Sequence, residues 1–579
     1  MEHKETQKQQ MTGYPSIDKP WLKYYSEEAI NAPLPECTAY ELLYQNNKDF
    51  PNDVALIYYG RRFSYGELFE NIEKAARAFW SLGVRQGDIV ILCTVNMPET
   101  VYAFYGLNRL GAVANLVDPR TNEDSLRNYI KECNAKIVVT VNLASSKIQK
   151  AAKESSAEHI VVVSPSDSLS LVKRVLYNIK NRIEKEDSMI AWRDFIRQGK
   201  DGVLDYPPYE KGSCSIIAHT GGTTGIPKGV MLTNDNINAV TFGYKYTGIP
   251  FERQQKYFND LPPFIMYGIV LAMHTPLCYG LKVILHPIFN SGKFPEQFKK
   301  YKPNHFSGVN DHVKYLASDS SIKHMDLSFL ITSAIGGDFL NEKTESDVNE
   351  FLKSHGCKYE VVKGYGMTEL GATACTSFEG ANEIGSVGIP LVANVFKVMD
   401  LDSGEELGYN QTGEIWISSP SIMQGYYRNP EATAEIICAD RDGMRWIRTG
   451  DLGHIDERGL IFLEGRIKRI YSTVDKGQPA KIFPGLVEDV LKKSNDVYDC
   501  TVVGRFVAHK AYYEAIAYVI LKDKGMQQKK VISGLAECCR EKLPSYMWPV
   551  EYRFLDDFPR TPIGKVDFRE LERMAAEGE

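Results

Sequence analysis

The sequence predicts an α/β protein with a large amino-terminal domain of α/β layers, a small β-barrel-like part and a smaller α+β carboxy-terminal domain. From about Arg61 onward, strand-like and helix-like segments alternate, which is typical of a parallel sheet covered by helices. After Gly413, short alternating segments indicate antiparallel strands and a hairpin, and beyond Ile470 a compact stretch has its own strand–helix–strand pattern. A length of 579 residues also excludes a single small domain.

The first elements of the α/β part carry clear start and stop signals. Ser64 and Glu67 form a capping-box pattern, apolar residues follow at helical spacing, and Gly83 ends the expected helix. Residues 89–95 are apolar except for Thr94 and predict a buried strand, after which residues 98–110 predict a helix. This order predicts repeated strand–helix units in the first half of the chain.

Composition and charge narrow the class of protein. The chain is 43% hydrophobic and 25% charged, as in globular proteins. Its 68 basic and 74 acidic residues give a net charge of −6, so nucleic acid is not an expected partner. The 11 cysteines form no C-x-x-C pair or regular framework, which favours reduced thiols and a cytoplasmic location.

Contact with a membrane surface remains an open interpretation for one segment only. The amino-terminal residues are polar, and the most apolar stretch, residues 268–285, is interrupted by His274, Pro276 and Lys282, so a buried helix and strand are expected there. Residues 171–183 combine an apolar helical face with surrounding basic side chains. They form either a solvated helix packed on the first domain or a peripheral contact with an anionic membrane surface.

A loop rich in glycine and threonine is a candidate for phosphate binding. Residues 219–229 read HTGGTTGIPKG and follow the apolar run SIIA. Backbone N–H groups freed by glycine, threonine hydroxyls and the ammonium group of Lys228 suit a polyphosphate. Pro227 precedes Lys228, so the loop differs from the Walker pattern. Taken alone, such a loop could also be a flexible surface turn.

Two further motifs carry groups that suit a nucleotide and a metal ion. Residues 364–369, GYGMTE, offer an aromatic face, a hydroxyl and a carboxylate, which suit base stacking, phosphate contact and Mg²⁺. Residues 448–453, RTGDLG, place Asp451 at an expected tight turn, where it could accept both hydroxyls of a ribose. Taken alone, the first motif could be an ordinary loop and the second an Asx turn.

Five motifs in this order, HTGGTTGIPKG, GYGMTE, RTGDLG, EGRIKR and PRTPIGK, resemble those of the adenylate-forming (AMP-binding) superfamily, in its acyl-CoA synthetase or fatty-acid–CoA ligase branch. The resemblance extends from about Ala55 to Leu571. It implies that a carboxylic acid attacks the α-phosphorus of ATP to give an acyl-adenylate and pyrophosphate, and that a thiol then takes the acyl group. ATP, Mg²⁺ and coenzyme A are the implied cofactors. An ATP- and acid-binding domain is implied at residues 1–468, and a mobile domain with the catalytic lysine at residues 469–579.

The resemblance also assigns roles to individual residues. Lys565 is expected to be the catalytic lysine, Thr368 to contact the α-phosphate, and Glu369 to act in catalysis by holding Mg²⁺. Arg469 is expected to be the hinge, although relatives usually carry Asp or Lys there. The residues expected to bind ATP are Thr220, Gly221, Gly222, Thr223, Thr224, Gly225, Lys228, Gly336, Gly337, Asp338, Gly364, Tyr365, Thr368, Asp451 and Arg466.

The expected acid pocket is mostly apolar, which indicates a hydrocarbon or aryl tail recognised through buried area. By the same resemblance, its residues are Phe264, Ile265, Tyr267, Ser307, Gly308 and Gly366. Ile265 stands where many relatives carry histidine. Asp260 precedes the position where amino-acid-activating relatives place an aspartate, so an amino acid is a disfavoured substrate.

Three interpretations of the function remain open. The first is an acyl-CoA synthetase for a medium- or long-chain fatty acid, with an aryl or branched acid as an option. The second is a stand-alone ligase that loads an aryl or fatty acid onto a separate carrier protein. The chain ends shortly after Lys565, so in both cases the acceptor thiol is expected from another molecule. The third is a catalytically silent nucleotide-binding or scaffold protein, against which Lys565, Glu369 and Thr368 argue.

Overall fold

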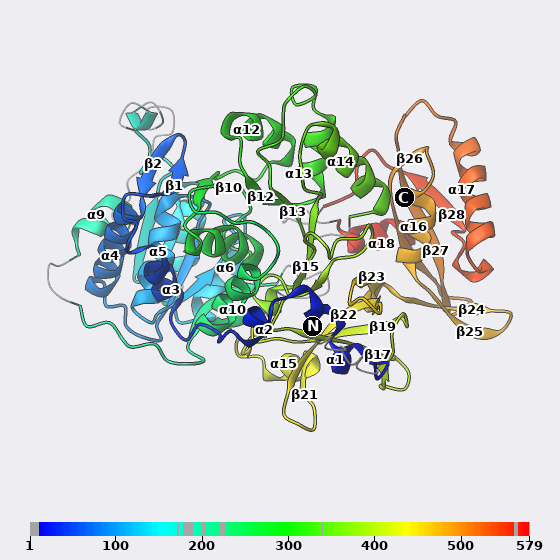
Figure 1. The fold of residues 1–579 in the computed structure, drawn as a ribbon, viewed down its shortest axis with the longest axis horizontal. Helices are drawn as coiled ribbons and strands as arrows, with labels where there is room; N and C mark the ends of the chain where they lie inside the picture. Colours follow the sequence, from blue (N-terminus) through cyan, green and yellow to red (C-terminus); the bar gives the residue numbers. More distant parts are fainter. Residues whose placement is uncertain are drawn as a thin grey trace, which may run out of the picture.

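The computed structural model confirms the predicted α/β class (Figure 1). A large amino-terminal portion, blue to yellow in the figure, contains two mostly parallel sheets and one antiparallel sheet, and a smaller orange-to-red portion follows it. The structure describes residues 11–153, 155–170, 173–175, 177, 189–199, 204–220, 227–337, 340–560 and 566–577. Most of the amphipathic segment 171–183 lies outside these residues.

The first sheet has eight strands in the order β20-β9-β8-β4-β3-β5-β6-β7. They are β3 (Ile89–Cys93), β4 (Val113–Leu116), β5 (Ile137–Val141), β6 (His159–Val163), β7 (Met189–Ala191), β8 (Cys214–His219), β9 (Gly229–Thr233) and β20 (Gly425–Tyr426). Strands β3 to β8 pair in parallel, whereas β9 runs antiparallel to β8 and β20 antiparallel to β9. The apolar run predicted at residues 89–95 is therefore a central strand.

The second sheet has nine strands in the order β16-β15-β14-β13-β12-β10-β11-β1-β2. They are β1 (Val54–Tyr58), β2 (Arg61–Ser64), β10 (Lys256–Asn259), β11 (Lys282–Leu285), β12 (His305–Gly308), β13 (Thr332–Ile335), β14 (Val362–Tyr365), β15 (Cys375–Thr376) and β16 (Ile389–Pro390). Strands β10, β12, β13 and β14 are parallel neighbours. Their carboxyl ends therefore meet at one edge of the sheet.

The helices begin where local signals place them. Ser64 Oγ accepts a hydrogen bond from the Glu67 amide and the Glu67 carboxylate accepts one from the Ser64 amide, which confirms the predicted capping box of α4. Almost every residue of α5 and α10 is buried, so both are interior helices. The described helices up to residue 354 are α1 (Pro15–Asp18), α2 (Glu27–Asn31), α3 (Ala39–Asn47), α4 (Tyr65–Ser81), α5 (Pro98–Arg109), α6 (Glu123–Glu132), α7 (Ser145–Ala152), α9 (Trp192–Arg197), α10 (Asn234–Lys245), α11 (Thr275–Cys278), α12 (Phe294–Tyr301), α13 (Asn310–Ser318) and α14 (Glu342–Ser354).

The most apolar stretch of the chain folds into the interior, as predicted. A π-helical stretch, η3 (Tyr267–His274), runs into α11, and β11 follows. Its residues from Gly268 to His274 are all buried. Among the described helices, none has the length and apolar character needed to cross a membrane.

The third sheet is antiparallel, as predicted after Gly413. Its strands are β17 (Val395–Met399), β18 (Glu406–Leu407), β19 (Gly413–Ser418), β21 (Ile437–Ala439), β22 (Arg445–Ile455) and β23 (Ile461–Arg466). Strands β22 and β23 form the predicted hairpin. The short helix α15 (Pro430–Ile436) precedes β21.

The carboxy-terminal portion has hydrophobic clusters of its own, which contain only residues from Tyr471 onward. Its elements are β24 (Tyr471–Asp475), β25 (Gln478–Ile482), α16 (Pro484–Lys492), β26 (Val497–Val507), β27 (Tyr512–Leu521), α17 (Gln528–Lys542), β28 (Glu551–Phe554) and α18 (Phe568–Glu577). Strands β26 and β27 are antiparallel, and β28 joins β27 in parallel. Polar contacts link this portion to α14, including a hydrogen bond of 3.1 Å from Lys343 Nζ to Asn495 Oδ1.

Candidate active site

Predicted ATP-binding and acid-binding residues converge at the carboxyl edge of the second sheet. Gly308 ends β12, Gly336 directly follows β13, and Tyr365 ends β14. The Tyr267 hydroxyl lies 3.2 Å from the carbonyl oxygens of both Gly308 and Ala334, so its ring spans the ends of β12 and β13. A Cβ atom added at Gly336 would lie 3.5 Å from Tyr267 Cζ. Open α/β sheets bind their ligands at such an edge.

Three of the predicted motifs meet in what we call the Tyr365 cluster: Tyr365, Asp451 and Arg466. The Tyr365 hydroxyl donates to Asp451 Oδ2 at 2.6 Å, and Asp451 Oδ1 pairs with Arg466 Nε at 2.8 Å. Tyr365 and Asp451 are buried. Burial, and then the neighbouring carboxylate, raise the pKa of Tyr365 well above its usual range. The phenol therefore remains a neutral hydrogen-bond donor that orients the acid.

The expectation of a tight turn at Asp451 is wrong. Asp451 lies inside the long strand β22, at an irregularity in the pairing with β19. Glu414 pairs with Leu452 and Trp416 with Arg448, so the single residue between them on β19 faces three residues of β22. Gly450 supplies the positive φ of 70° that this β-bulge requires. A bulge re-aims the side chains that it carries, and here it carries the predicted ribose ligand.

The two described residues of the predicted phosphate loop, Thr220 and Lys228, lie directly after β8 and directly before β9. Thr220 donates its amide to the Lys228 carbonyl oxygen at 3.0 Å, and the Lys228 amide donates to Thr220 Oγ1 at 3.2 Å. These bonds close the base of the predicted loop. Gly221, Gly222, Thr223, Thr224 and Gly225 lie outside the described residues, as do Asp338 and Lys565.

Tyr426 is a site residue that the sequence analysis missed. Its hydroxyl donates to Glu369 Oε1 at 2.7 Å, and its ring centre lies 4.8 Å from Lys228 Nζ. Strand β20 holds it there by pairing with β9, the strand that follows Lys228. Tyr426 therefore connects the phosphate loop to the expected Mg²⁺ ligand. Only its place in the run QGYYRNPEAT, just before a helix start at Pro430, could have drawn attention to it.

The residues near Glu369 fit a magnesium ion bound with the help of ATP. Glu369 is buried in a short turn that begins at Thr368, and its carbonyl oxygen accepts from the Met423 amide at 2.9 Å. In the described part of the chain, no three His, Cys, Asp or Glu side chains gather as a metal site. Mg²⁺ commonly uses one or two carboxylates, several waters and substrate phosphates, so a single carboxylate suits it.

The residues predicted to bind the acid are closely packed. Ser307 Oγ lies 2.5 Å from the Tyr257 hydroxyl, and Phe264 is buried while Ile265 is half-buried. A Cβ atom at Gly366 would lie 2.2 Å from the Ala372 carbonyl oxygen, so only glycine fits there. A small, mostly apolar cavity below the strand ends is lined by Tyr244, Phe251, Tyr257, Leu271, Thr275, Pro276, Ser307, Thr332 and Ala334.

The Asp260 carboxylate is hydrogen-bonded to a buried histidine inside the protein. Its two carboxylate oxygens lie 3.3 and 3.2 Å from His312 Nε2, and both residues are buried. His312 Nδ1 accepts from the Val309 amide at 3.1 Å, so Nε2 carries the proton and donates to Asp260. This arrangement agrees with the expectation that Asp260 does not receive a substrate ammonium group.

The fold and this arrangement of motifs place the protein in the class of adenylate-forming enzymes. A family model described as AMP-binding enzyme matches residues 43–427, and one described as AMP-binding enzyme C-terminal domain matches residues 486–565. The chain belongs to the AMP-binding enzyme family, in its branch of AMP-forming acyl-CoA ligases.

Curated relatives and solved structures agree with this assignment. The chain is 28% identical to a long-chain-fatty-acid–CoA ligase of Bacillus subtilis (strain 168), covering 96% of this chain and 97% of that protein. It is 29% identical to 4-coumarate–CoA ligase-like 2 of Arabidopsis thaliana, covering 89% and 86%. The fold matches ATP-bound MatB from Rhodopseudomonas palustris with a TM-score of 0.78 at 23% identity, covering 93% and 99%. An anthranilate CoA ligase, AuaEII, in complex with anthranoyl-AMP, gives a TM-score of 0.78 at 21% identity, covering 95% and 99%.

Proposed function

We propose that the protein activates a medium- or long-chain fatty acid with ATP and transfers the acyl group to coenzyme A, releasing AMP and pyrophosphate. The observation that carries this proposal is that Tyr365 of the Tyr365 cluster and Tyr267 of the mostly apolar acid pocket both lie at the carboxyl edge of the second sheet. A nucleotide site and an apolar acid site in contact are what acyl-adenylate formation needs, because the carboxylate must reach the α-phosphorus. The relatedness to a long-chain-fatty-acid–CoA ligase supports the choice of acid.

On the nucleotide side, Asp451 and Arg466 would bind the ribose, and Tyr365 would pack against adenine. Gly336 and Gly337 would leave room for the base: a Cβ atom added at Gly337 would meet nothing within 4 Å, and this residue has a φ of 86°. Thr220 and Lys228 would contact the β- and γ-phosphates. The ammonium group of Lys228 suits a polyphosphate because it can donate hydrogen bonds to phosphate oxygens.

At the reacting centre, Thr368 would contact the α-phosphate and Glu369 would hold Mg²⁺, which would supply positive charge to the phosphate oxygens. Tyr426 would keep the Glu369 carboxylate oriented through its hydrogen bond. Lys565 would bridge the substrate carboxylate and the α-phosphate, where negative charge builds as the acyl oxygen attacks phosphorus.

On the acid side, Tyr267, Phe264 and Ile265 would enclose the hydrocarbon tail. The described cavity is small, so a long chain would require Tyr267 or its neighbours to move. That cavity and the relatedness to a 4-coumarate–CoA ligase-like protein favour an aryl acid as the second candidate substrate. Loading of a separate carrier protein remains the second candidate for the acyl acceptor.

A screen of carboxylic acids by pyrophosphate release from Mg²⁺ and ATP tests the proposal. Saturated acids of increasing length should be compared with benzoate, coumarate and amino acids, and the best acid then offered coenzyme A or a phosphopantetheinylated carrier protein. We expect the highest kcat/KM with a medium- or long-chain acid and acyl transfer to coenzyme A. Turnover only with aryl acids, or only with the carrier, would select the alternatives, and no acid-dependent release would reject adenylation.

A further inference from the structure

A buried ion pair stands directly before the GYGMTE motif. Lys363 lies in β14, and its ammonium group donates to Glu345 of α14 and, at 2.6 Å, to the carbonyl oxygen of Glu383. The other carboxylate oxygen of Glu345 accepts from the Gly385 amide at 3.1 Å. The side chains of Lys363 and Glu345 are 6% and 1% exposed, so the pair is removed from water.

A gain in folding stability does not by itself explain why this buried ion pair is present. Burial raises the pKa of Glu345 and lowers that of Lys363, whereas the charge of each partner opposes the effect on the other. Desolvation of two charges costs several kcal/mol per ion, so a well-packed apolar pair of similar volume is often as stable or more stable. An ion pair also fixes geometry, because both partners must keep their hydrogen-bond distances.

On one side, the pair fixes the strand that carries Tyr365. Side chains two residues apart on a strand lie on the same face, so Lys363 and Tyr365 are neighbours on one face of β14. The Lys363 amide also donates to Ser377 Oγ at 2.8 Å, and the Ser377 amide donates to the Lys363 carbonyl oxygen at 2.8 Å. The backbone of β14 is therefore held at Lys363 by its hydrogen bonds with Ser377, and the ammonium group adds a side-chain connection from the same residue.

On the other side, the pair fixes the segment 383–388, which is bound to β23. The Val387 amide donates to the Ile461 carbonyl oxygen at 2.9 Å, and the Ile461 amide donates to the Gly388 carbonyl oxygen at 2.9 Å. The Glu383 carboxylate pairs with Arg458 in the turn before β23. Strand β23 ends at Arg466, whose backbone pairs with that of Asp451 on β22.

We infer that Lys363 is a positioning residue that sets the separation between Tyr365 on β14 and Asp451 and Arg466 on the β22–β23 hairpin. These three residues come from two different sheets, and the buried Lys363–Glu345 pair, together with the partly exposed segment 383–388, forms a short connection between those sheets. The inference rests on the proposed role of the Tyr365 cluster in binding adenosine. Lys363 itself acts through Tyr365 and the hairpin and does not contact the nucleotide.

The test compares AMP affinity with thermal stability in the full-length protein. Lys363→Met breaks the pair, and the double variant Lys363→Met with Glu345→Leu replaces it by apolar side chains. Leu352→Ala is the matched control, because Leu352 is a buried residue of α14 outside the network. The dissociation constant of AMP is measured by titration calorimetry, and the melting temperature by differential scanning fluorimetry.

We expect AMP to bind about tenfold more weakly to both pair variants, since small misplacements of binding groups cost affinity of this order. The melting temperature should fall for Lys363→Met and recover in the double variant, whose AMP affinity should stay low. In acid-dependent pyrophosphate exchange, the KM for ATP should rise while the KM for the acid stays within about twofold. Leu352→Ala should lower the melting temperature and leave AMP affinity unchanged.

Two results would overturn the inference. One is AMP affinity within about twofold of wild type in the double variant, which would make the pair purely structural. The other is a wild-type protein that binds no AMP, which would remove the adenosine role of the Tyr365 cluster as well. Wild-type binding of AMP that is lost in both pair variants, without activation of any acid, would support the positioning role and reject the proposed function alone.

Discussion

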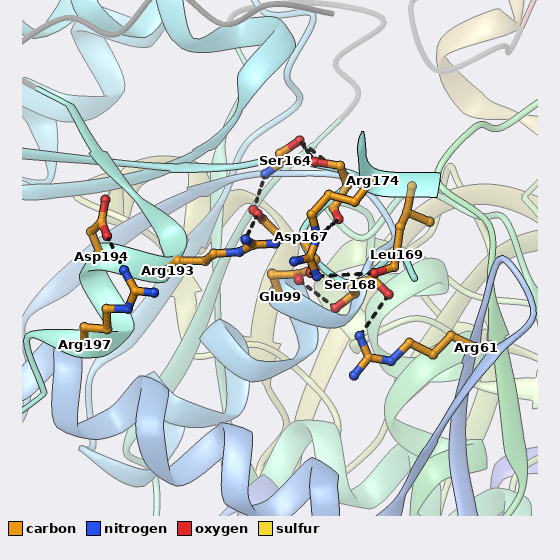
Figure 2. Close-up of polar contacts among 11 residues, drawn as sticks. Arg61, Glu99, Ser164, Asp167, Ser168, Leu169, Arg174, Arg193, Asp194 and Arg197 are labelled. Atoms are coloured by element: carbon orange, nitrogen blue, oxygen red, sulfur yellow. Dashed lines mark hydrogen bonds and ion pairs between the residues drawn. The ribbon is translucent and has the colours of Figure 1, made fainter. Parts of the chain in front are cut away.

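At the scale of single residues, Glu99 is an unusual feature outside the candidate active site (Figure 2). It is 2% exposed at the start of α5, and its Oε1 accepts from Ser168 Oγ at 2.7 Å. Among the described residues, its Oε2 has no hydrogen-bond partner. Burial raises the pKa of Glu99 to about 8, Asp167 adds to the shift, and the Ser168 bond and Arg61 oppose it. Glu99 is therefore mostly protonated at neutral pH.

Glu99→Gln should remove a pH dependence of stability. The folded-state pKa is raised, so the contribution of Glu99 to stability is complete below its ordinary pKa of 4.5 and is lost as pH rises through about 8. Between these values the loss is about 1.4 kcal/mol per pH unit. The melting temperature of Glu99→Gln relative to wild type should therefore rise from pH 5 to pH 8. The exposed Glu70→Gln is the control, and parallel curves for wild type and Glu99→Gln would contradict the prediction.

The segment that covers Glu99 is held by a second set of contacts in the same view. The Arg174 guanidinium donates to the carbonyl oxygens of Asp167 and Leu169 at 3.2 and 3.3 Å, and Arg193 Nε lies 3.6 Å from Asp167 Oδ1 (Figure 2). Arg174 is one of the basic side chains expected around the apolar helical face of residues 171–183. In the structure it lies in a helical stretch, and its guanidinium binds the backbone of the preceding turn.

At the scale of elements, η3 carries Tyr267, which belongs to the proposed acid pocket. Tyr267→Ala should open space at the ends of β12 and β13, because the ring bridges the Gly308 and Ala334 carbonyl oxygens. We expect the preferred acid to become longer. One extra buried methylene contributes about 0.8 kcal/mol, which is about fourfold in relative kcat/KM. Tyr267→Phe keeps the ring and should retain the wild-type profile. An unchanged chain-length profile in Tyr267→Ala would exclude Tyr267 from the pocket.

The element that carries Asp451 shows where local sequence rules fail. RTGDLG contains the residues of a tight turn, and Gly450 does adopt a positive φ. Pairing with β19 on one side and β23 on the other nevertheless keeps the segment in a strand, so the glycine serves a bulge and not a turn. A positive φ is readily adopted by glycine, so the conformation of Gly450 agrees with its residue type. Its position in a bulge and not in a turn depends on strand partners from distant parts of the sequence.

At the scale of the whole molecule, Arg469 belongs to the packing of the carboxy-terminal portion. Its guanidinium donates to Glu488 of α16 and to the Val502 carbonyl oxygen at 3.0 Å, and it lies 3.9 Å from the ring centre of Phe568. The proposed pivot after residue 468 is compatible with these contacts, because Arg469 would then move together with the carboxy-terminal portion.

Arg469→Pro should separate the two half-reactions. Proline fixes φ near about −65°, which restricts the backbone where large φ/ψ changes are proposed. We expect acyl-adenylate formation to persist while acyl transfer to the thiol falls. Arg469→Ala is the control, since it removes the guanidinium without restricting φ. Equal losses of both half-reactions in Arg469→Pro would argue against a hinge at this residue.

For Lys565 we expect the opposite effect on the two half-reactions. Arg560 and Val566, on either side of it, pair as an isolated bridge in the carboxy-terminal portion. Lys565→Ala should lower the rate of acyl-adenylate formation by about 10²–10³, the usual effect of removing one donor that stabilises transition-state charge. It should still convert a supplied acyl-adenylate and thiol to product. Near-normal adenylation would remove Lys565 from the mechanism, and Lys524→Ala serves as a control for loss of a surface lysine.

The sequence by itself determined the elements that obey local rules. The α4 capping box, the central strand β3 and the buried run after Gly268 were all predicted, because capping and periodicity involve residues close along the chain. The motif order also identified the superfamily. These features can be predicted without knowing which residues pack against them.

Only the tertiary structure decided which distant groups meet. The bond from Tyr365 to Asp451, the bond from Tyr426 to Glu369 and the ion pair of Lys363 with Glu345 each join residues from separate elements. Their formation depends on strand order, on the bulge in β22 and on the burial that excludes water from competing for these groups. Such contacts leave no periodic pattern in the sequence, because their geometry is fixed by how sheets pack and not by neighbouring residues.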